Sequence, residues 1–394
     1  MVKIVRVRPV LLSAPYANTE TNLEVAHHLK SGYRTCGMVE IMLDDGTTGL
    51  GEGYLAVFAP RIFEELIHLL SPTLIGRDIN DHVQISHDLQ VTTGYWSLQG
   101  AAQHALSAID IAIWDCRAKL ANMPLYRFLG YDGSPTLKLY ASGGDSLHPD
   151  AMEVEFEQIQ QLGCDVFKIR ARNDDVNKAT WCLKRGSQAN IRIAIDMTQN
   201  LAMPSQSIDD IIAFLEQIGF NDRTAFIEEA LGPDVIDQFP DLCSKVDIKI
   251  AGGEIITTFR EIAQRVREHY YDIVQPDATV IGGVQSVVDV FTVANEVNCE
   301  VYVHCWGGAV GMMANYHAAL SGGGKIAELP LPAFSIRDRM ADWQVRDGQL
   351  HLPDTPGLGV HLTPEIEREF AFREDAVYAC LVPQSHKLPD AVWR

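Results

Sequence analysis

From residue 137 onward the sequence repeats one unit, a short apolar segment followed by a stretch with helical periodicity, and this repeat restricts the fold more than any other feature. Alternating strands and helices are typical of a parallel sheet. The eight apolar segments span residues 137–142, 166–171, 191–197, 225–229, 248–252, 273–276, 301–303 and 326–329. Eight units within about 190 residues favour a closed α/β barrel over an open sheet, although such a barrel usually takes about 250 residues.

The residues on either side of this repeat follow other patterns. Residues 2–12, 37–43 and 49–53 resemble strands, and a tight turn at 44–46 joins the last two, which predicts a meander. Residues 99–120 carry apolar side chains at helical spacing, which predicts a strongly buried helix. The tail lacks the barrel repeat and is expected to fold back onto the N-terminal layer. We therefore predict an α+β capping domain at 1–135, a barrel at 136–331 and a returning C-terminal segment at 332–394.

Polar residues close most of the apolar segments. Because the chemistry of an α/β barrel gathers at the carboxyl ends of its strands, these residues are the candidates for a functional site. In chain order they are Lys168, Arg170, Asp196, Glu228, Glu254, Asp277, His304 and Glu328.

Asp196, Glu228 and Glu254 end three consecutive predicted strands and should converge on one point. Three carboxylates do not stay ionised together without a cation. Ligation by oxygen alone favours Mg²⁺, with Mn²⁺ as an alternative, and disfavours Zn²⁺ because no His or Cys takes part. The competing interpretation, that each carboxylate caps the following helix, is weaker for three consecutive strands than for one.

Two further pairs accompany this predicted metal site. Asp277 and His304 end adjacent strands, where the carboxylate can fix the tautomer of the imidazole and raise its basicity for acid–base catalysis. Lys168 and Arg170 alternate along one strand, so both side chains should point into the barrel mouth. They would supply the local positive charge that an acidic substrate requires.

Because the whole chain is strongly acidic, an acidic substrate needs local cations that offset the negative charge around it. The chain has 32 basic and 52 acidic residues, hence a net charge of −20, which disfavours nucleic acid and anionic membrane surfaces as partners. The eight cysteines are scattered, and no apolar run of 18 residues occurs, so we expect a cytoplasmic protein without a membrane segment.

The residues at the strand ends, taken together, resemble those of the enolase superfamily, in particular its mandelate racemase subgroup. Residues 45–53, 108–115 and 276–283 extend the resemblance over nearly the whole chain. The resemblance implies an α+β cap, made from the N-terminal part and the C-terminal tail, over a (β/α)7β barrel. It also implies a reaction in which Mg²⁺ holds a substrate carboxylate, a base removes the α-proton and the metal stabilises the resulting enediolate.

By resemblance, Asp196, Glu228 and Glu254 are metal ligands, Asp277 and His304 form the catalytic dyad, and Glu328 donates a hydrogen bond to the enediolate. The partner is then a small carboxylate molecule, a sugar acid, and we expect the chain to form a homo-oligomer. Cap loops largely set specificity in this family. Candidate substrate contacts are therefore His28 and Arg34, in the loop at residues 16–36, together with Ser142 at the end of the first barrel strand.

The sequence departs from the family pattern at Arg170, where a second lysine is usual, and at Thr198 and Ala230, where Asn and Pro are common. Arginine is effectively always charged, so a base on that face is in doubt. Dehydration of a sugar acid to a 2-keto-3-deoxy acid needs only His304 and is favoured. Alternatives are a racemase or epimerase of a hydroxy acid and a catalytically silent metal-binding member. A zinc hydrolase and a dinucleotide enzyme are weaker, because the chain has no His-x-His and its glycine-rich residues 49–53 lie between strands.

Overall fold

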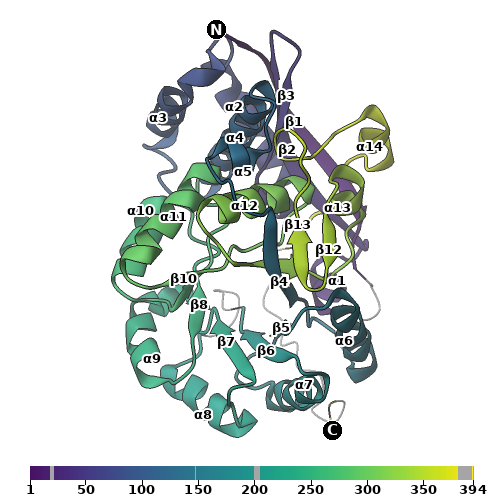
Figure 1. Ribbon diagram of the computed structural model, residues 1–394, viewed down its shortest axis with the longest axis vertical. Coiled ribbons are helices and arrows are strands. Elements are labelled where there is room, and N and C mark those ends of the chain that lie inside the picture. Colours follow the sequence, from purple (N-terminus) through teal and green to yellow (C-terminus); the bar gives the residue numbers. More distant parts are fainter. Residues whose placement is uncertain (18–21, 147, 199–204, 380–392, 394) are drawn as a thin grey trace.

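The computed structural model describes residues 1–17, 22–146, 148–198, 205–379 and 393, and Figure 1 shows a small sheet with its helices at one end and a barrel at the other. The small sheet has three antiparallel strands in the order β1 (Ile4–Pro15), β2 (Tyr33–Leu43) and β3 (Thr48–Glu52). The predicted meander is thus confirmed. The helical elements around this sheet are α1 (Leu23–His28), η1 (Tyr54–Val57), α2 (Pro60–Leu70), η2 (Ser71–Thr73), η3 (Ile79–Asp81), α3 (His82–Thr93), α4 (Ala101–Leu120) and α5 (Leu125–Phe128).

Helix α4 is the buried helix predicted from the apolar spacing, and its backbone lies directly on β3. A Cβ atom at Gly51 would come within 1.8 Å of the Ala108 carbonyl oxygen, and one at Gly49 within 2.3 Å of the Ala112 carbonyl oxygen. Only glycine permits this approach. The two glycines therefore let the sheet and the helix pack closely enough to place Glu52, at the end of β3, over the barrel.

The barrel has the eight strands that the sequence predicts, and its strand pairs are all parallel. The strands are β4 (Thr136–Ser142), β5 (Val166–Arg170), β6 (Arg192–Asp196), β7 (Thr224–Glu228), β8 (Ile250–Gly252), β9 (Ile273–Val274), β10 (Glu300–Val301) and β11 (Ile326–Pro330). Strand β11 pairs with β4, and a bridge between Val303 and Ala327 joins the other edge, so the sheet closes. This is the (β/α)7β barrel.

The helical elements between these strands cover the outside of the barrel (Figure 1). They are α6 (Pro149–Leu162), α7 (Val176–Ala189), α8 (Ile208–Ile218), η4 (Pro233–Gln238), α9 (Phe239–Lys245), α10 (Phe259–Arg267), α11 (Val284–Glu296) and α12 (Ala309–Ser321). Inside, Tyr140, Phe226 and their neighbours form a buried cluster. The ring of Tyr140 lies 5.7 Å from the Nζ atom of Lys168, so this cluster forms the floor beneath the polar strand ends.

The C-terminal segment contacts both parts of the molecule. It contains α13 (Ser335–Met340), β12 (Gln344–Arg346), β13 (Gln349–His351) and α14 (Pro364–Glu369). Strand β13 pairs antiparallel with the start of β4, and the following chain returns to β1, where the Ser13 amide donates to the Phe370 carbonyl at 2.8 Å. The domain limits at residues 135 and 331 stay a prediction. No helix in the described part of the chain is long and apolar enough to span a membrane.

Candidate active site

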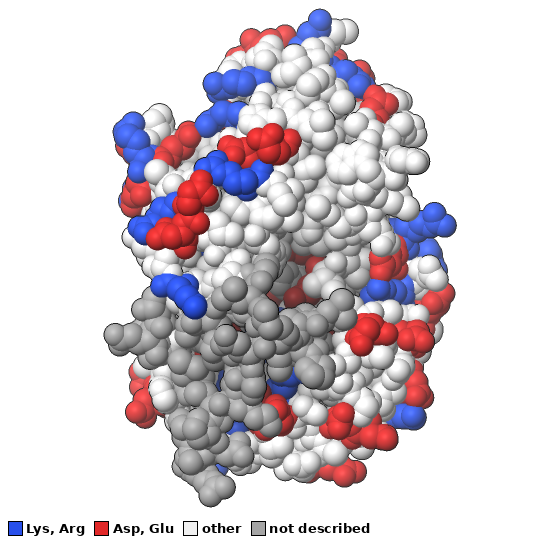
Figure 2. Space-filling model, turned by 180° about the vertical axis from the view of Figure 1, so that it is seen from behind, with Lys and Arg blue, Asp and Glu red and all other residues white. Residues whose placement is uncertain are grey.

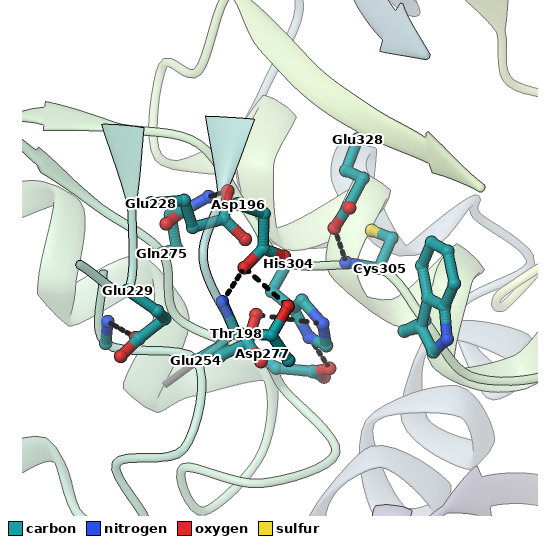
Figure 3. A network of polar contacts seen from close by, with 12 residues as sticks. Asp196, Thr198, Glu228, Glu229, Glu254, Gln275, Asp277, His304, Cys305 and Glu328 are labelled. Atoms are coloured by element: carbon teal, nitrogen blue, oxygen red, sulfur yellow. Dashed lines mark hydrogen bonds and ion pairs between the residues drawn. The ribbon is translucent and has the colours of Figure 1, made fainter. Parts of the chain in front are cut away.

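Three carboxylates meet at the carboxyl ends of neighbouring barrel strands. Asp196 ends β6, Glu228 ends β7, and Glu254 follows β8 by two residues. One oxygen atom from each lies within 4.8 Å of the others, and Asp196 and Glu228 are buried (Figure 3). The parallel register forces this meeting, because Asp196 pairs with Glu228 across the two strands. The predicted convergence is therefore observed, while the role of these residues as ligands stays a prediction.

Neighbouring groups fix the orientation of these carboxylates. The Thr198 amide and hydroxyl donate to Oδ1 of Asp196 at 2.7 and 3.0 Å, and Nε2 of Gln275 donates to Oε2 of Glu228 at 2.6 Å. The second oxygen of Asp196 accepts from Arg170, and that of Glu228 accepts from Lys168. Gln275 was not singled out from the sequence, although its place directly before Pro276 and Asp277 at a strand end was a usable signal.

Lys168 is completely buried among these carboxylates. It forms ion pairs with Glu228 and, at 2.8 Å, with Glu328, and lies 3.9 Å from Asp196. Burial alone would lower the pKa of Lys168, but Glu228, Glu328 and Asp196 outweigh it and raise the pKa. Lys168 is therefore a fixed positive charge.

Arg170 pairs with Asp196, and its guanidinium lies 4.7 Å from the ring centre of Trp306, a residue that the sequence analysis missed. Burial opposes its charge, yet Asp196 and Asp145 raise its pKa further above the ordinary value for arginine. This face of the site thus presents a guanidinium that holds its protons.

The charges around the three carboxylates fit a divalent cation. Asp196, Glu228, Glu254 and Glu328 can carry four negative charges, whereas Lys168 and Arg170 carry two positive ones, so two negative charges stay unbalanced. Burial raises the pKa of Glu228, and Asp196 and Glu254 raise it further against the opposing effect of Lys168. An ion with charge +2 and a preference for oxygen ligands would remove this cost.

His304 and Asp277 form the predicted pair. Nδ1 of His304 lies 2.8 Å from Oδ2 of Asp277 (Figure 3). The other oxygen of Asp277 accepts hydrogen bonds from Thr279 and, at 2.9 Å, from Asn315. A carboxylate accepts here, so Nδ1 carries the proton and Nε2 faces the site, 3.4 Å from Oε2 of Glu254. Burial alone would lower the pKa of His304, but Glu254, the Asp277 hydrogen bond and Glu328 raise it to about 10.

Glu328 is held at the end of β11. Its Oε2 accepts the Cys305 amide at 2.7 Å, and Ser142 lies fully buried beside it. Burial would raise the pKa of Glu328, but Lys168 and His304 outweigh it and lower the pKa to about 2. The group is an ionised acceptor in this arrangement, and the predicted donor role of Glu328 stays a prediction.

Of the three predicted substrate contacts, Ser142 lies among the polar residues at the strand ends, whereas Arg34 and His28 lie outside that group. Arg34 is 1% exposed, and its guanidinium donates to the Trp306 carbonyl at 2.6 Å and to the Tyr54 hydroxyl at 3.3 Å. The donation to Trp306 ties the cap to the barrel loop that follows His304, whereas the donation to Tyr54 stays within the cap.

His28 instead meets the C-terminal segment. Its ring stacks on Tyr378 with centres 4.3 Å apart, and Tyr378 in turn contacts Phe58 at 5.1 Å. The cap reaches the dyad through Tyr54, whose ring centre lies 6.1 Å from that of His304. Residues 18–21 of the predicted specificity loop lie outside the described residues.

The fold and the site together define a capped (β/α)7β barrel with three carboxylates that could hold a metal ion and a histidine–aspartate pair. The sequence model described as "Enolase C-terminal domain-like" matches residues 151–366, and that of the "Mandelate racemase / muconate lactonizing enzyme, N-terminal domain" matches residues 17–130. The chain belongs to this family of the enolase superfamily.

Several relatives are named sugar-acid dehydratases. Arabinonate dehydratase of Saccharolobus solfataricus is 23% identical over 84% of this chain and 89% of its own. D-galactonate dehydratase of Pectobacterium atrosepticum is 25% identical over 83% of this chain and 89% of its own. L-talarate/galactarate dehydratase of Salmonella typhimurium is 26% identical over 84% of this chain and 81% of its own.

Solved structures support the fold. The 3,6-anhydro-D-galactonate cycloisomerase of Zobellia galactanivorans superposes with a TM-score of 0.81, at 24% identity over 94% of this chain and 100% of its own. A variant of L-talarate/galactarate dehydratase, liganded with Mg and L-glucarate, has a TM-score of 0.79 at 23% identity, over 94% of this chain and 92% of its own.

Proposed function

We propose that this chain is a Mg²⁺-dependent hydro-lyase that dehydrates a sugar acid to a 2-keto-3-deoxy acid. The observation that carries the proposal is the asymmetry of the site: one face presents Nε2 of His304, and the other presents Arg170 paired with Asp196. The names of the relatives, arabinonate, galactonate and galactarate dehydratases, support the same reaction class.

Asp196, Glu228 and Glu254 would hold the ion, and Lys168 adds a fixed positive charge beneath them. When bound, Mg²⁺ supplies Lewis-acid stabilisation of the negative charge that develops on a carboxylate substrate. This stabilisation is needed because a proton on the carbon next to a carboxylate is a very weak acid.

His304 performs both proton transfers in this proposal. Among the charges that raise its pKa, that of Glu254 is the largest, so a cation held by Glu254 would offset this effect and free Nε2 to act as a base. Nε2 takes the α-proton, the electron pair of the C–H bond forms a carbon–carbon double bond, and the bond to the β-hydroxyl breaks. The imidazolium returns the proton to the departing hydroxide, which leaves as water, and the enol product becomes the 2-keto acid. Asp277 holds the Nδ1 proton throughout and stabilises the transient positive charge.

Racemisation or epimerisation would need a second group that exchanges protons on the opposite face. Arg170 and Lys168 both have raised pKa values, because each is paired with carboxylates, so neither accepts a proton readily. Elimination of water does not need a second base on the opposite face. Among the described residues, neither Lys168 nor Arg170 therefore suits the second base that an epimerase needs. The silent-member alternative does not account for the complete histidine–aspartate pair.

The test is a screen of sugar monoacids and diacids with Mg²⁺, in which 2-keto acid formation is measured and EDTA serves as the control. Formation of a 2-keto acid that EDTA abolishes would support the proposal. Exchange of the α-proton in D₂O without loss of water would indicate an epimerase instead. Absence of both reactions across the library would favour a silent member and contradict the proposal.

A further inference from the structure

The wall of the site beyond Arg170 is formed by the loop between β4 and α6, and this loop is held rigidly. The Gly144 amide donates to Oε2 of Glu155 at 2.7 Å, the Ser146 hydroxyl donates to the other oxygen of Glu155, and Nζ of Lys178 donates to the Gly144 carbonyl at 2.6 Å. Asp145 lies between these two anchored residues. Its position is therefore fixed by neighbours on both sides.

Gly144 brings this loop onto strand β5. Its φ is +75°, and a Cβ atom there would come within 2.4 Å of the Ile169 Cα atom and 3.0 Å of the Arg170 amide nitrogen. A larger residue does not fit at this contact. The close approach places Asp145 next to Arg170, at the mouth of the barrel.

The Asp145 side chain is 8% exposed, and within the described part of the chain its carboxylate takes part in no hydrogen bond. Its oxygens are not sealed from solvent, so this nearly buried carboxylate keeps acceptor positions open to a ligand. Its charge acts on Arg170 from the barrel, on Glu24 from the cap and on Tyr378 from the C-terminal segment. These three residues come from different parts of the molecule.

The cap contributes a second carboxylate at the same place. A backbone bridge between Asn22 and Ser146 brings the start of α1 against the loop. Glu24, on α1, accepts the Tyr16 hydroxyl at 3.1 Å, and its charge acts on Asp145. Arg170 is already paired with Asp196, and Lys178 and Glu155 balance each other behind the loop. The far wall of the site is therefore acidic. Figure 2, which shows the molecule from behind, has acidic side chains inside a hollow near its centre.

We propose that Asp145 binds hydroxyl groups of the substrate chain and makes the site selective for sugar monoacids over sugar diacids. This inference rests on the proposed dehydration of a sugar acid. An ionised carboxylate accepts hydrogen bonds from two neighbouring hydroxyls, while Arg170 supplies donors beside it. A second substrate carboxylate would meet Asp145 and Glu24 as like charges, with only the shared Arg170 to offset them.

Burial, followed by the charges of Glu24 and Glu155, raises the pKa of Asp145 to about 7 against the opposing effect of Arg170. The experiment is best run above that pH, where the side chain is ionised. It compares aldonates, which have one carboxylate, with the aldarates of the same stereochemistry, in the presence of Mg²⁺. Two readouts are used: the rate of 2-keto acid formation, and binding by calorimetry, which does not require turnover.

We expect the wild-type protein to prefer the aldonate, and Asp145→Asn to lower kcat/KM for it while raising the aldarate-to-aldonate ratio about 10-fold or more. The matched control is Asp150→Asn, which makes the same change at an exposed position five residues along the chain and should leave the ratio unchanged. Thermal melting of both variants verifies that they fold.

Each outcome separates this inference from the proposed function. Turnover of aldarates in preference to aldonates, or an unchanged ratio in folded Asp145→Asn, would overturn the selectivity while leaving dehydration intact. Selective binding of an aldonate without turnover of any substrate would support the role of Asp145 and contradict the dehydratase proposal.

Discussion

At the residue scale, the direction of one imidazole determines what the site can do. His304 uses Nδ1 for Asp277, so only Nε2 faces the space beside Glu254. Asp277 in turn has its second oxygen occupied by Thr279 and Asn315 and does not compete for substrate protons. Asp277 thus binds His304 through one oxygen and its supporting residues through the other. Nε2 is therefore the nitrogen of His304 that can exchange a proton with a substrate.

His304→Asn is expected to abolish exchange of the α-proton while leaving Mg²⁺ affinity nearly unchanged. The amide can keep a hydrogen bond to Asp277 but has no basic nitrogen, and a positioned general base typically contributes about 10²–10⁴-fold to the rate. Exchange is measured in D₂O by mass spectrometry and metal affinity by calorimetry. His87→Asn, on the exposed face of α3, is the control, and exchange retained in His304→Asn would remove His304 from the role of base.

At the element scale, helix α12 connects the cap, the dyad and the C-terminal segment. Glu52 from β3 accepts the Gly308 and Gly311 amides at 2.6 and 2.8 Å, at the amino end of the helix. Further along, Asn315 holds Asp277, and the Tyr316 hydroxyl donates to the Glu328 carbonyl at 2.7 Å. The helix therefore fixes the strand ends that carry the reaction, and its stability bears on their geometry.

His317, on the same helix, makes the stability of this element depend on pH. It is completely buried, its Nδ1 accepts the Tyr126 amide at 3.0 Å, and its Nε2 donates to the Leu358 carbonyl at 3.3 Å. Burial, opposed by the Leu358 bond, lowers its pKa from 6.5 to about 3. Between these values the unfolded chain binds a proton that the folded chain does not, so this contribution to stability is present above pH 6.5 and is lost as the pH falls towards 3.

His317→Gln is expected to unfold more easily at neutral pH but to lose less stability in acid. Glutamine can make both hydrogen bonds and does not titrate. Between about pH 7.5 and about pH 5, the free energy of unfolding should fall by about 2 kcal/mol more in the wild-type protein than in the variant. Urea unfolding at the two pH values measures the difference, and equal losses in both proteins would show that His317 does not cause the acid sensitivity.

At the scale of the whole molecule, a chain of net charge −20 gathers four carboxylates at one point, and the cap closes over them through Arg34, Tyr54 and Glu52. The folded state therefore stores electrostatic repulsion that a bound cation would relieve. The expected homo-oligomer and the cytoplasmic location stay predictions from the sequence.

Mg²⁺ is expected to stabilise the whole protein against heat, and EDTA to reverse the effect. If Mg²⁺ binds only the folded state, binding adds about 2.7 kcal/mol to the free energy of unfolding when the free ion concentration is about 100 times Kd. Glu254→Gln should bind Mg²⁺ far more weakly and lose most of this response, whereas the exposed Glu216→Gln should keep it. Thermal melting with and without Mg²⁺ measures the response, and equal responses in wild type and Glu254→Gln would contradict the assignment of Glu254 as a ligand.

The sequence by itself determined the eight barrel strands, the cap meander and the residues that meet at the strand ends. Local periodicity defines a strand, and parallel strands bring Asp196, Glu228 and their neighbours to the same edge whatever surrounds them. Only the tertiary structure decided that Gln275 and Asn315 support this cluster, that Arg34 and His28 join the cap to other segments, and that Gly144 brings its loop onto strand β5. These contacts join residues far apart in the chain, so they depend on packing between elements, which no local pattern in the sequence records.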